Sequence, residues 1–332
     1  MRQILLPPTL KAARPSIGEV VALHGETMGT GWSLRYVARP TLPRETVQRA
    51  VQARLDALVG EMSTWDAGSD LLRYNTAMPG TWCALPSDCF TVLQAALACA
   101  SQTNGAYDPT AGPLVDLWGF GPPGPVTAPP SPAALAAARA RTGWPRVQLD
   151  PAKRRALQPG GIQLDLSAIA KGYAVDAIGR VLTGLGIDHH LVEIGGELRG
   201  AGLKPDGQPW WVQLESPTAP GLPLPETVVA LYGVAIATSG DYRQGFTHAG
   251  RHYSHTLDPR SGKPLQNDLA AVTVLHASGM QADALATALL VLGLEKGLAH
   301  AQRHGIAARF VQRQRTGLVA RLSPAMSDWL AP

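Results

Sequence analysis

The sequence predicts an α+β fold, in which strands and helices are mixed without a steady βα alternation. Three observations lead to this prediction. Apolar residues recur with helical spacing over 44–62, β-branched residues cluster over 228–240, and glycine or proline turns separate such segments. The 332 residues are 45% apolar, as in ordinary globular proteins. They fit two similar lobes, each with strands and a long helix.

The first half of the chain predicts helices among short strands. Ser131 and Pro132 are typical of an N-cap and a first helical position, and Gly105 is typical of a helix end. In chain order we expect a strand over 31–38, helices over 44–62, 89–105 and 131–143, and a hairpin over 146–166.

The second half predicts several strands around two longer helices. The glycine pair in "EIGGEL" predicts a turn between strands. Proline-rich surface loops are expected at 121–132, which holds six prolines, and at 217–225. The expected elements are a helix over 167–186, a strand with a turn over 189–202, strands over 210–215, 228–240 and 250–262, a helix over 281–293, and a hairpin over 308–322.

Residues 1–20 are interpreted as an N-terminal extension, followed by a single domain over 21–332 with a proline-rich insertion at 121–132. The apolar core "ILL" is too short for a secretory signal, and no lipid-attachment cysteine follows it. No run of 18 or more apolar residues predicts a membrane-spanning helix. We therefore expect a cytoplasmic protein. A trimmed or alternative start leaves a periplasmic location as the alternative.

Cysteine usage and charge exclude several classes of protein. Cys83, Cys89 and Cys99 are odd in number and lack CxxC spacing, which argues against a disulfide framework or a zinc cluster. The net charge of +4 and pI near 9.1 permit a phosphate-bearing ligand. The basic residues are dispersed and aromatic residues make up only 6% of the chain, so nucleic acid is not indicated as a partner.

The helix expected over 281–293, "QADALATALLVLG", carries two polar groups on one side. Asp283 and Thr287 lie about 40° apart around its axis. The remaining residues are apolar all round, which indicates a buried helix, and a buried carboxylate needs a partner. Two interpretations stay open. Asp283 is an N-cap with Thr287 bonded back to its carbonyl, or both residues supply oxygen ligands to a hard metal ion.

Two further segments carry groups suited to chemistry. His248, His252 and His255 suggest zinc by their spacing, but they fall on an expected strand, where such spacing does not share one face. His255 is either a positioned acid or base, or a surface histidine. In "LDLSAIAKGYAVD", Asp165 is either a helix cap or a ligand contact, and Lys171 is suited to a phosphate or flavin.

Eight short motifs, in this order along the chain, resemble those of the ApbE family, which are FAD:protein FMN transferases. No single motif is specific, but eight in order over residues 22–294 are. The motifs are "ETMGTGWSL", "MSTWD…SDLLRYN", "YDPTAGPLVDLWGFG", "LDLSAIAKGYAVDAI", "VEIGGELRGAG", "AIATSGDYRQGF", "HTLDPRSGKPL" and "ADALATALLVLG".

The resemblance implies an α+β fold with an FAD cleft, and an enzyme that uses FAD as a substrate together with Mg²⁺. Such an enzyme cuts the FAD pyrophosphate, transfers FMN to a Thr or Ser hydroxyl of an acceptor protein as a phosphoester, and releases AMP. The acceptor segment implied is S/T-G-A-S/T. Two alternatives are an Mg²⁺-dependent FAD pyrophosphatase and a non-catalytic FAD-binding protein.

The resemblance also implies site residues, position by position. Metal oxygens would come from Asp283 and Thr287, and from Ala168 through its carbonyl, because alanine has no side-chain oxygen. His255 would transfer the proton of the acceptor hydroxyl, with Asp283 as the rival base. The implied flavin contacts are Met28, Trp65, Ala106, Tyr107, Asp108, Asp165, Lys171 and Thr256.

The chain departs from the family pattern in two places. The family's export signal and lipid-attachment cysteine are missing from this sequence. The proline-rich stretch at 121–132 directly follows "WGFG", where it is expected to alter the groove for the acceptor.

Overall fold

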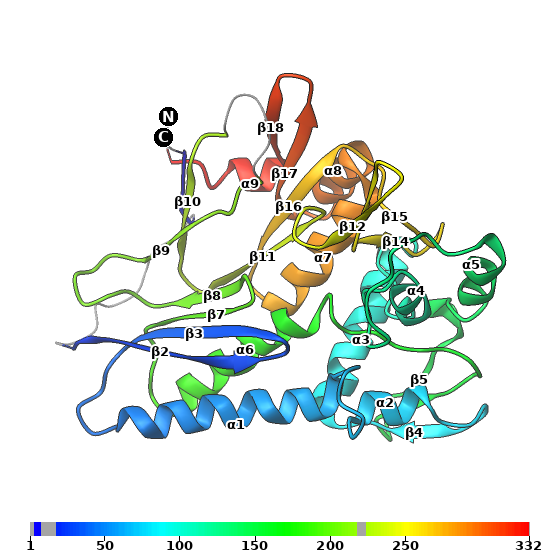
Figure 1. Cartoon of the computed structure of the whole chain (residues 1–332). Helices are drawn as coiled ribbons and strands as arrows, with labels where there is room; N and C mark the ends of the chain where they lie inside the picture. The colour runs from blue at the N-terminus through cyan, green and yellow to red at the C-terminus, as the bar shows by residue number, and fades with distance from the viewer. Residues whose placement is uncertain (1–2, 8–17, 218–223, 332) are drawn as a thin grey trace.

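The computed structural model describes residues 3–7, 18–217 and 224–331 (Figure 1). Its centre is an eight-stranded sheet in the order β18-β17-β16-β11-β8-β7-β3-β2, antiparallel throughout. These strands are β2 (Val20–Thr27), β3 (Thr30–Val37), β7 (His190–Ile194), β8 (Glu197–Ala201), β11 (Val234–Gly240), β16 (Leu269–His276), β17 (Ala307–Gln314) and β18 (Gly317–Leu322).

Two helices make the most extensive contacts with one face of this sheet (Figure 1). They are α6 (Ala170–Gly184), against β7 and β8, and α7 (Gly279–Leu292), against β11 and β16. The long helix α1 (Arg44–Met62) packs on α6. The other described helices are α2 (Asp70–Asn75), α3 (Ser87–Gln102), α4 (Gly112–Leu117), α5 (Pro132–Arg139), α8 (Leu294–Arg303), α9 (Pro324–Ser327) and a 3₁₀ turn at Trp144–Arg146.

Smaller sheets and hairpins surround this frame. One three-stranded sheet has the order β4-β6-β5, from β4 (Trp82–Ala84), β5 (Gln148–Asp150) and β6 (Arg155–Leu157). Another has the order β1-β10-β9, from β1 (Gln3–Leu5), β9 (Trp210–Gln213) and β10 (Thr227–Leu231). The hairpins are β12 (Gly245–His248) with β13 (Arg251–Ser254), and β14 (Leu257–Asp258) with β15 (Lys263–Pro264).

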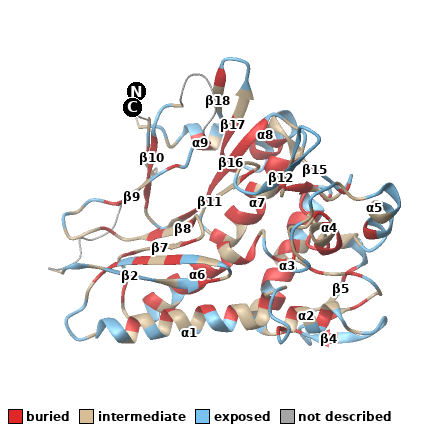
Figure 2. Ribbon diagram, in the orientation of Figure 1, coloured by how far each residue is buried: buried red, intermediate tan, exposed pale blue. Residues whose placement is uncertain are grey.

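The main apolar core lies between the helices and the large sheet, where buried residues line the facing sides of α1, α3, α6 and α7 (Figure 2). A second, smaller core covers the opposite face of the sheet and includes Trp210, Leu231 and Ile236. Alternation along β11 separates the two cores, because Ile236 belongs to the second and Ala237 to the first.

Helices α6 and α7 cross backbone against backbone at two glycines. A Cβ atom on Gly172 would lie 2.2 Å from the carbonyl oxygen of Gly279, and one on Gly279 would lie 2.5 Å from the carbonyl oxygen of Gly172. Only glycine allows an approach this close. The crossing brings the first turns of the two helices together.

The α+β prediction is confirmed, and α1 has the bounds expected for it. Strand β16 was not predicted, because its first seven residues are all buried and give no polar–apolar alternation. Helix α8 was not predicted either, since its buried residues include no large apolar side chain. Most of the loop expected at 217–225 lies outside the described residues. Across the described ranges, no helix has the length and apolar character needed to cross a membrane.

Candidate active site

The N-terminus of α7 is capped by Ser278, whose side chain accepts a hydrogen bond from the backbone N–H of Gln281. Asp283 therefore lies inside the helix, beyond its first turn. The interpretation of Asp283 as an N-cap is wrong, because the cap position is occupied five residues earlier. The buried carboxylate needs another reason to be there.

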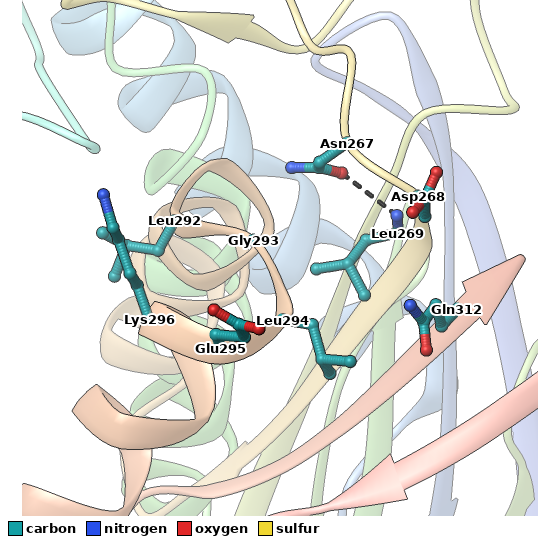
Figure 3. A pocket seen from close by; sticks show the side chains of 9 residues that line it. All are labelled: Asn267, Asp268, Leu269, Leu292, Gly293, Leu294, Glu295, Lys296 and Gln312. Atoms are coloured by element: carbon teal, nitrogen blue, oxygen red, sulfur yellow. Dashed lines mark hydrogen bonds between the residues drawn. The ribbon is translucent and has the colours of Figure 1, made fainter.

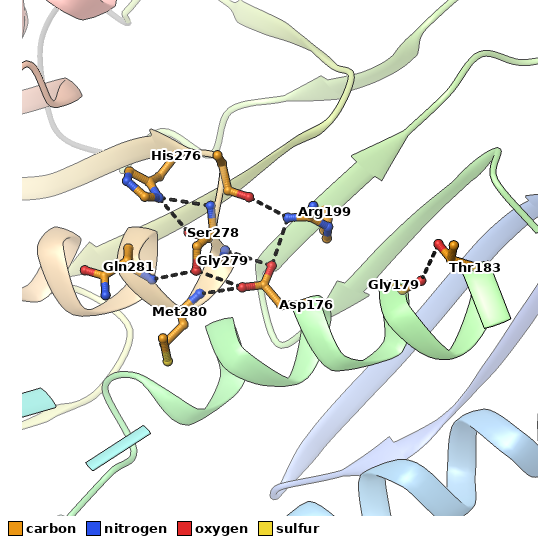
Figure 4. A network of polar contacts seen from close by, with 10 residues as sticks. Asp176, Gly179, Thr183, Arg199, His276, Ser278, Gly279, Met280 and Gln281 are labelled. Atoms are coloured by element: carbon orange, nitrogen blue, oxygen red, sulfur yellow. Dashed lines mark hydrogen bonds and ion pairs between the residues drawn. The ribbon is translucent and has the colours of Figure 1, made fainter. Parts of the chain in front are cut away.

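A carboxylate from α6 completes the cap from outside the helix (Figure 4). Asp176 accepts hydrogen bonds from the backbone N–H groups of Gly279, at 2.9 Å, and Met280, at 3.2 Å. It also accepts from the hydroxyl of Ser278 and from the guanidinium of Arg199, each at 2.9 Å. Free N–H groups at a helix start carry positive partial charge, so this anion fixes the end of α7 to α6.

Asp283 is 3% exposed, and one of its oxygens accepts a hydrogen bond of 2.9 Å from the backbone N–H of Gly172. Within the described ranges its other oxygen accepts no hydrogen bond. Burial raises the pKa of Asp283, and the Lys171 ammonium and the Gly172 N–H oppose that rise. One carboxylate oxygen is thus left free for a cation.

The Lys171 ammonium lies 2.6 Å from the carboxylate of Glu197, which is 3% exposed. Burial and the neighbouring Asp283 carboxylate raise the pKa of Glu197, while Lys171 lowers it. Reasoning from sequence missed Glu197. Its signal was a charged residue directly after the turn at Gly195 and Gly196, at the first position of the strand Glu197–Ala201.

Thr287 is half-buried, and its hydroxyl lies 2.8 Å from the hydroxyl of Ser239 in β11. Ala168 is half-buried in the turn before α6 and packs against the main core. The chain offers one carboxylate, one hydroxyl and one backbone carbonyl, which are oxygen donors suited to a hard cation that keeps waters or phosphate oxygens. No group of three or more His, Cys, Asp or Glu side chains suited to a metal occurs in the described residues.

The segment after α3 is buried against this cluster. Ala106 is 1% exposed and Tyr107 is 3% exposed, and the Tyr107 hydroxyl has no hydrogen-bond partner in the described part of the chain. Burial raises the pKa of Tyr107, and nearby Cys99, Asp283 and Asp165 raise it further. Tyr107 therefore lies within electrostatic reach of three of the other predicted site residues, which are Asp283, Asp165 and Asp108.

Asp108 and Asp165 are held in local turns. Asp108 accepts hydrogen bonds from the backbone N–H and the hydroxyl of Thr110, at 2.8 and 2.6 Å. Burial raises the pKa of Asp108, and these bonds oppose the rise. Asp165 accepts a hydrogen bond of 2.7 Å from the backbone N–H of Ser167. It caps that turn, since α6 begins later and has Ile169 at its N-cap position.

Met28 occupies the turn between β2 and β3 with a φ of 49°, a left-handed conformation that is uncommon outside glycine. Thr30 follows this turn and lies beside Gly195, which also lies against the Lys171 side chain. The turn thus reaches the polar cluster. Trp65 does not join it by any hydrogen bond or ring contact in the described ranges, and its indole is 68% exposed.

His255 follows β13, and its Nδ1 atom lies 3.2 Å from the backbone carbonyl of Gln244. Its ring meets Phe120 edge-on at 6.2 Å between centroids. Burial lowers the pKa of His255, the carbonyl of Gln244 opposes this, and the Lys171 charge lowers it further. The imidazole is therefore neutral near pH 7, as a proton acceptor must be. Thr256, the next residue, is 9% exposed.

The hairpin that precedes His255 contacts the proline-rich insertion. His248 in β12 lies 3.1 Å from the backbone carbonyl of Thr127, and Phe246 stacks on Tyr253 with ring centroids 5.0 Å apart. The zinc interpretation of His248, His252 and His255 is wrong. The described residues contain no group of three or more His, Cys, Asp or Glu side chains that could hold a metal ion. The insertion therefore supports the hairpin that directly precedes His255.

Two cavities in the structure lie apart from the predicted site residues. One, of about 330 Å³, lies at the junction of α7 and α8 and is lined by Asn267, Asp268, Gly293, Glu295 and their neighbours (Figure 3). The other, of about 340 Å³, reaches Gly196, next to Glu197. Neither is lined by a residue that the sequence analysis placed in the site. The cluster of polar groups therefore marks the candidate site better than cavity size does.

Comparisons with known proteins agree on one family. The model of the ApbE family matches residues 28–310. The chain is 36% identical to the FAD:protein FMN transferase of Haemophilus influenzae, over 92% of this chain and 90% of that protein. It is 37% identical to that of Vibrio cholerae, over 94% and 93%.

Solved structures give the same result. The crystal structure of the Pseudomonas stutzeri flavinyl transferase ApbE has a TM-score of 0.86 and 42% identity, over 94% of this chain and 97% of that one. The flavin transferase ApbE from Vibrio cholerae also has a TM-score of 0.86, with 36% identity, over 95% of this chain and all of that one.

Proposed function

This chain belongs to the ApbE family, and we infer from that membership that it is an FAD:protein FMN transferase. The observation that carries this function is the likeness to the Vibrio cholerae enzyme, which spans nearly the whole of both chains. FAD is the substrate and an acceptor protein receives FMN. The acceptor is proposed to carry a Thr or Ser within a segment like S/T-G-A-S/T.

Mg²⁺ is proposed as the metal. Asp283 would hold it with its free carboxylate oxygen, Thr287 with its hydroxyl and Ala168 with its carbonyl. The donors fit the ion, because all three are oxygens and the buried carboxylate has an oxygen without a hydrogen bond. When bound, the ion supplies positive charge to the phosphoryl group during transfer.

The reaction exchanges one phosphorus–oxygen bond for another. The acceptor hydroxyl oxygen attacks the phosphorus of the FMN half of FAD, and the bond to the bridging oxygen breaks, so that AMP leaves with that oxygen. The hydroxyl proton passes to a base. We assign this role to His255, whose lowered pKa keeps the imidazole neutral near pH 7.

The remaining predicted residues are proposed to bind and orient FAD. The Lys171 ammonium is already paired with Glu197, so it can approach a phosphate or flavin oxygen without adding a net positive charge to the site. The turn at Met28 and the buried Ala106–Tyr107–Asp108 segment border the same cluster. We expect FAD to bind more tightly than FMN, because both phosphates and the adenosine would be held.

Intact-mass spectrometry tests the proposal. Enzyme, FAD and Mg²⁺ are mixed with a candidate acceptor, and with a control acceptor whose Thr or Ser is replaced by Ala. Gain of one FMN by the first acceptor alone supports transfer. Free FMN and AMP without a mass gain would show hydrolysis instead, and unchanged FAD would leave a binding protein.

A further inference from the structure

The hydroxyl of Thr287 forms its hydrogen bond outside its own helix, unlike several other helical threonines of this chain. Four threonines in or at the end of other helices bond back to the carbonyl four residues earlier, at 2.8 to 3.1 Å; these are Thr76, Thr91, Thr103 and Thr183. Thr287 makes no such bond to the carbonyl of Asp283. Its hydroxyl instead lies 2.8 Å from the hydroxyl of Ser239, 48 residues away in the chain.

Ser239 is directed to α7 by the alternation of β11. Ala237, two residues earlier on the same face, belongs to the core that α7 covers. Thr238 lies between them on the opposite face, where its hydroxyl is 2.9 Å from that of Thr273 in β16. The register of β11 thus places the hydroxyl of Ser239, and not that of Thr238, against Thr287.

We propose that Ser239 is a positioning residue for metal binding by Thr287, an inference that rests on the proposed function. A threonine oxygen that gives a lone pair to a cation must donate its hydrogen elsewhere. Ser239 is the acceptor for that hydrogen, and it keeps the Thr287 hydroxyl from rotating to the carbonyl of Asp283.

The neighbouring ligands make this role important in this chain. Ala168 offers only a backbone carbonyl, so Thr287 is the one side-chain ligand proposed besides Asp283. A hydroxyl turned toward its own helix would leave the cation with a single side-chain ligand. Partners that orient a metal ligand typically change metal affinity about 10- to 100-fold when they are removed.

The test is binding of Mg²⁺ to the full chain, measured by calorimetry, with Mn²⁺ as a spectroscopic probe of the same site. Ser239→Ala should weaken Mg²⁺ binding about 10- to 100-fold. Ser239→Thr keeps a hydroxyl and should restore most of the affinity. Thr238→Ala is the matched control. It removes one hydroxyl of the Thr238–Thr273 pair on the other face of the sheet and should leave the Mg²⁺ affinity unchanged.

The outcomes separate this inference from the proposed function. Wild-type affinity in Ser239→Ala, with binding lost in Asp283→Asn, would overturn the role of Ser239 and leave the metal site in place. A wild-type chain that transfers FMN yet binds neither ion would overturn both the inference and the proposed metal. If Thr238→Ala lowers the Mg²⁺ affinity as much as Ser239→Ala does, the inference is also overturned. The loss would then come from a general disturbance of β11 and not from the Ser239 hydroxyl.

Discussion

The backbone N–H of Gly172 in α6 donates a 2.9 Å hydrogen bond to the carboxylate of Asp283 in α7. This bond is possible because the two helices touch at Gly172 and Gly279 without any side chain between them. One contact therefore both packs the helices and orients the carboxylate that we propose for the metal.

Gly172→Ala should destabilise the fold and reduce transfer. The new methyl group would lie 2.2 Å from the Gly279 carbonyl oxygen and 2.6 Å from Cβ of Asp283, so the helices must separate. Overpacking of this kind costs about 1–3 kcal/mol of unfolding free energy. Urea unfolding measures it. Gly184→Ala in the same helix is the control, since nothing lies within 4 Å of its Cβ, and it should not destabilise.

Asp283→Asn should keep the fold but nearly stop transfer, because it removes the only charge among the proposed metal ligands. Thr287→Val keeps the side-chain volume and removes only the oxygen, so its smaller loss should be partly recovered at high Mg²⁺. Both variants are tested by measuring the rate of FMN transfer as a function of Mg²⁺ concentration. The melting temperature is the control for an intact fold. Curves that overlay the wild type would exclude a metal role for these residues.

His255→Ala should leave FAD binding intact and lower transfer by roughly 10²-fold or more. Burial lowers the pKa of His255 below its ordinary value near 6.5, so the neutral base is lost only in more acidic solution. Transfer by the wild type should therefore persist at pH 6.5 and fall only at lower pH. If the residual transfer by His255→Ala falls over the same acidic pH range, the group that takes up the proton is not His255.

Asp176→Ala should destabilise the start of α7. It removes the acceptor for two backbone N–H groups and leaves the Arg199 guanidinium with the Ala277 carbonyl alone. Breaking a largely buried ion pair costs about 3 kcal/mol or more of unfolding free energy. The pair of Lys204 and the exposed Asp206 is the control, and Asp206→Ala should destabilise the fold much less, because solvent screens an exposed ion pair. Equal losses in the two variants would contradict the role of Asp176.

His190 should make the fold sensitive to acid. Burial lowers the pKa of His190 to about 4, whereas the unfolded chain takes up the proton near pH 6.5. The unfolded state therefore binds more protons between these values, and stability falls as the pH drops from 6.5 to 4, by about 3 kcal/mol at the lower end. Urea unfolding at both pH values should show a smaller difference in His190→Gln.

Local chemistry in the sequence was enough for α1, for the Ser131 cap, for the glycine turn between β7 and β8, and for the helix that carries Asp283 and Thr287. Each of these depends on residues a few positions apart, and spacing along the chain reports such neighbours directly. The eight ordered motifs similarly sufficed to indicate the family.

The partners of the site residues were decided only by the tertiary structure. Asp283 meets Gly172 across 111 residues, Thr287 meets Ser239 across 48, and Lys171 meets Glu197 across 26. No periodicity in the chain encodes these pairs, because they depend on the order of strands in the sheet and on where two glycines let α6 and α7 touch. The local pattern placed a carboxylate in a buried helix, and the helix crossing determined which atoms surround it.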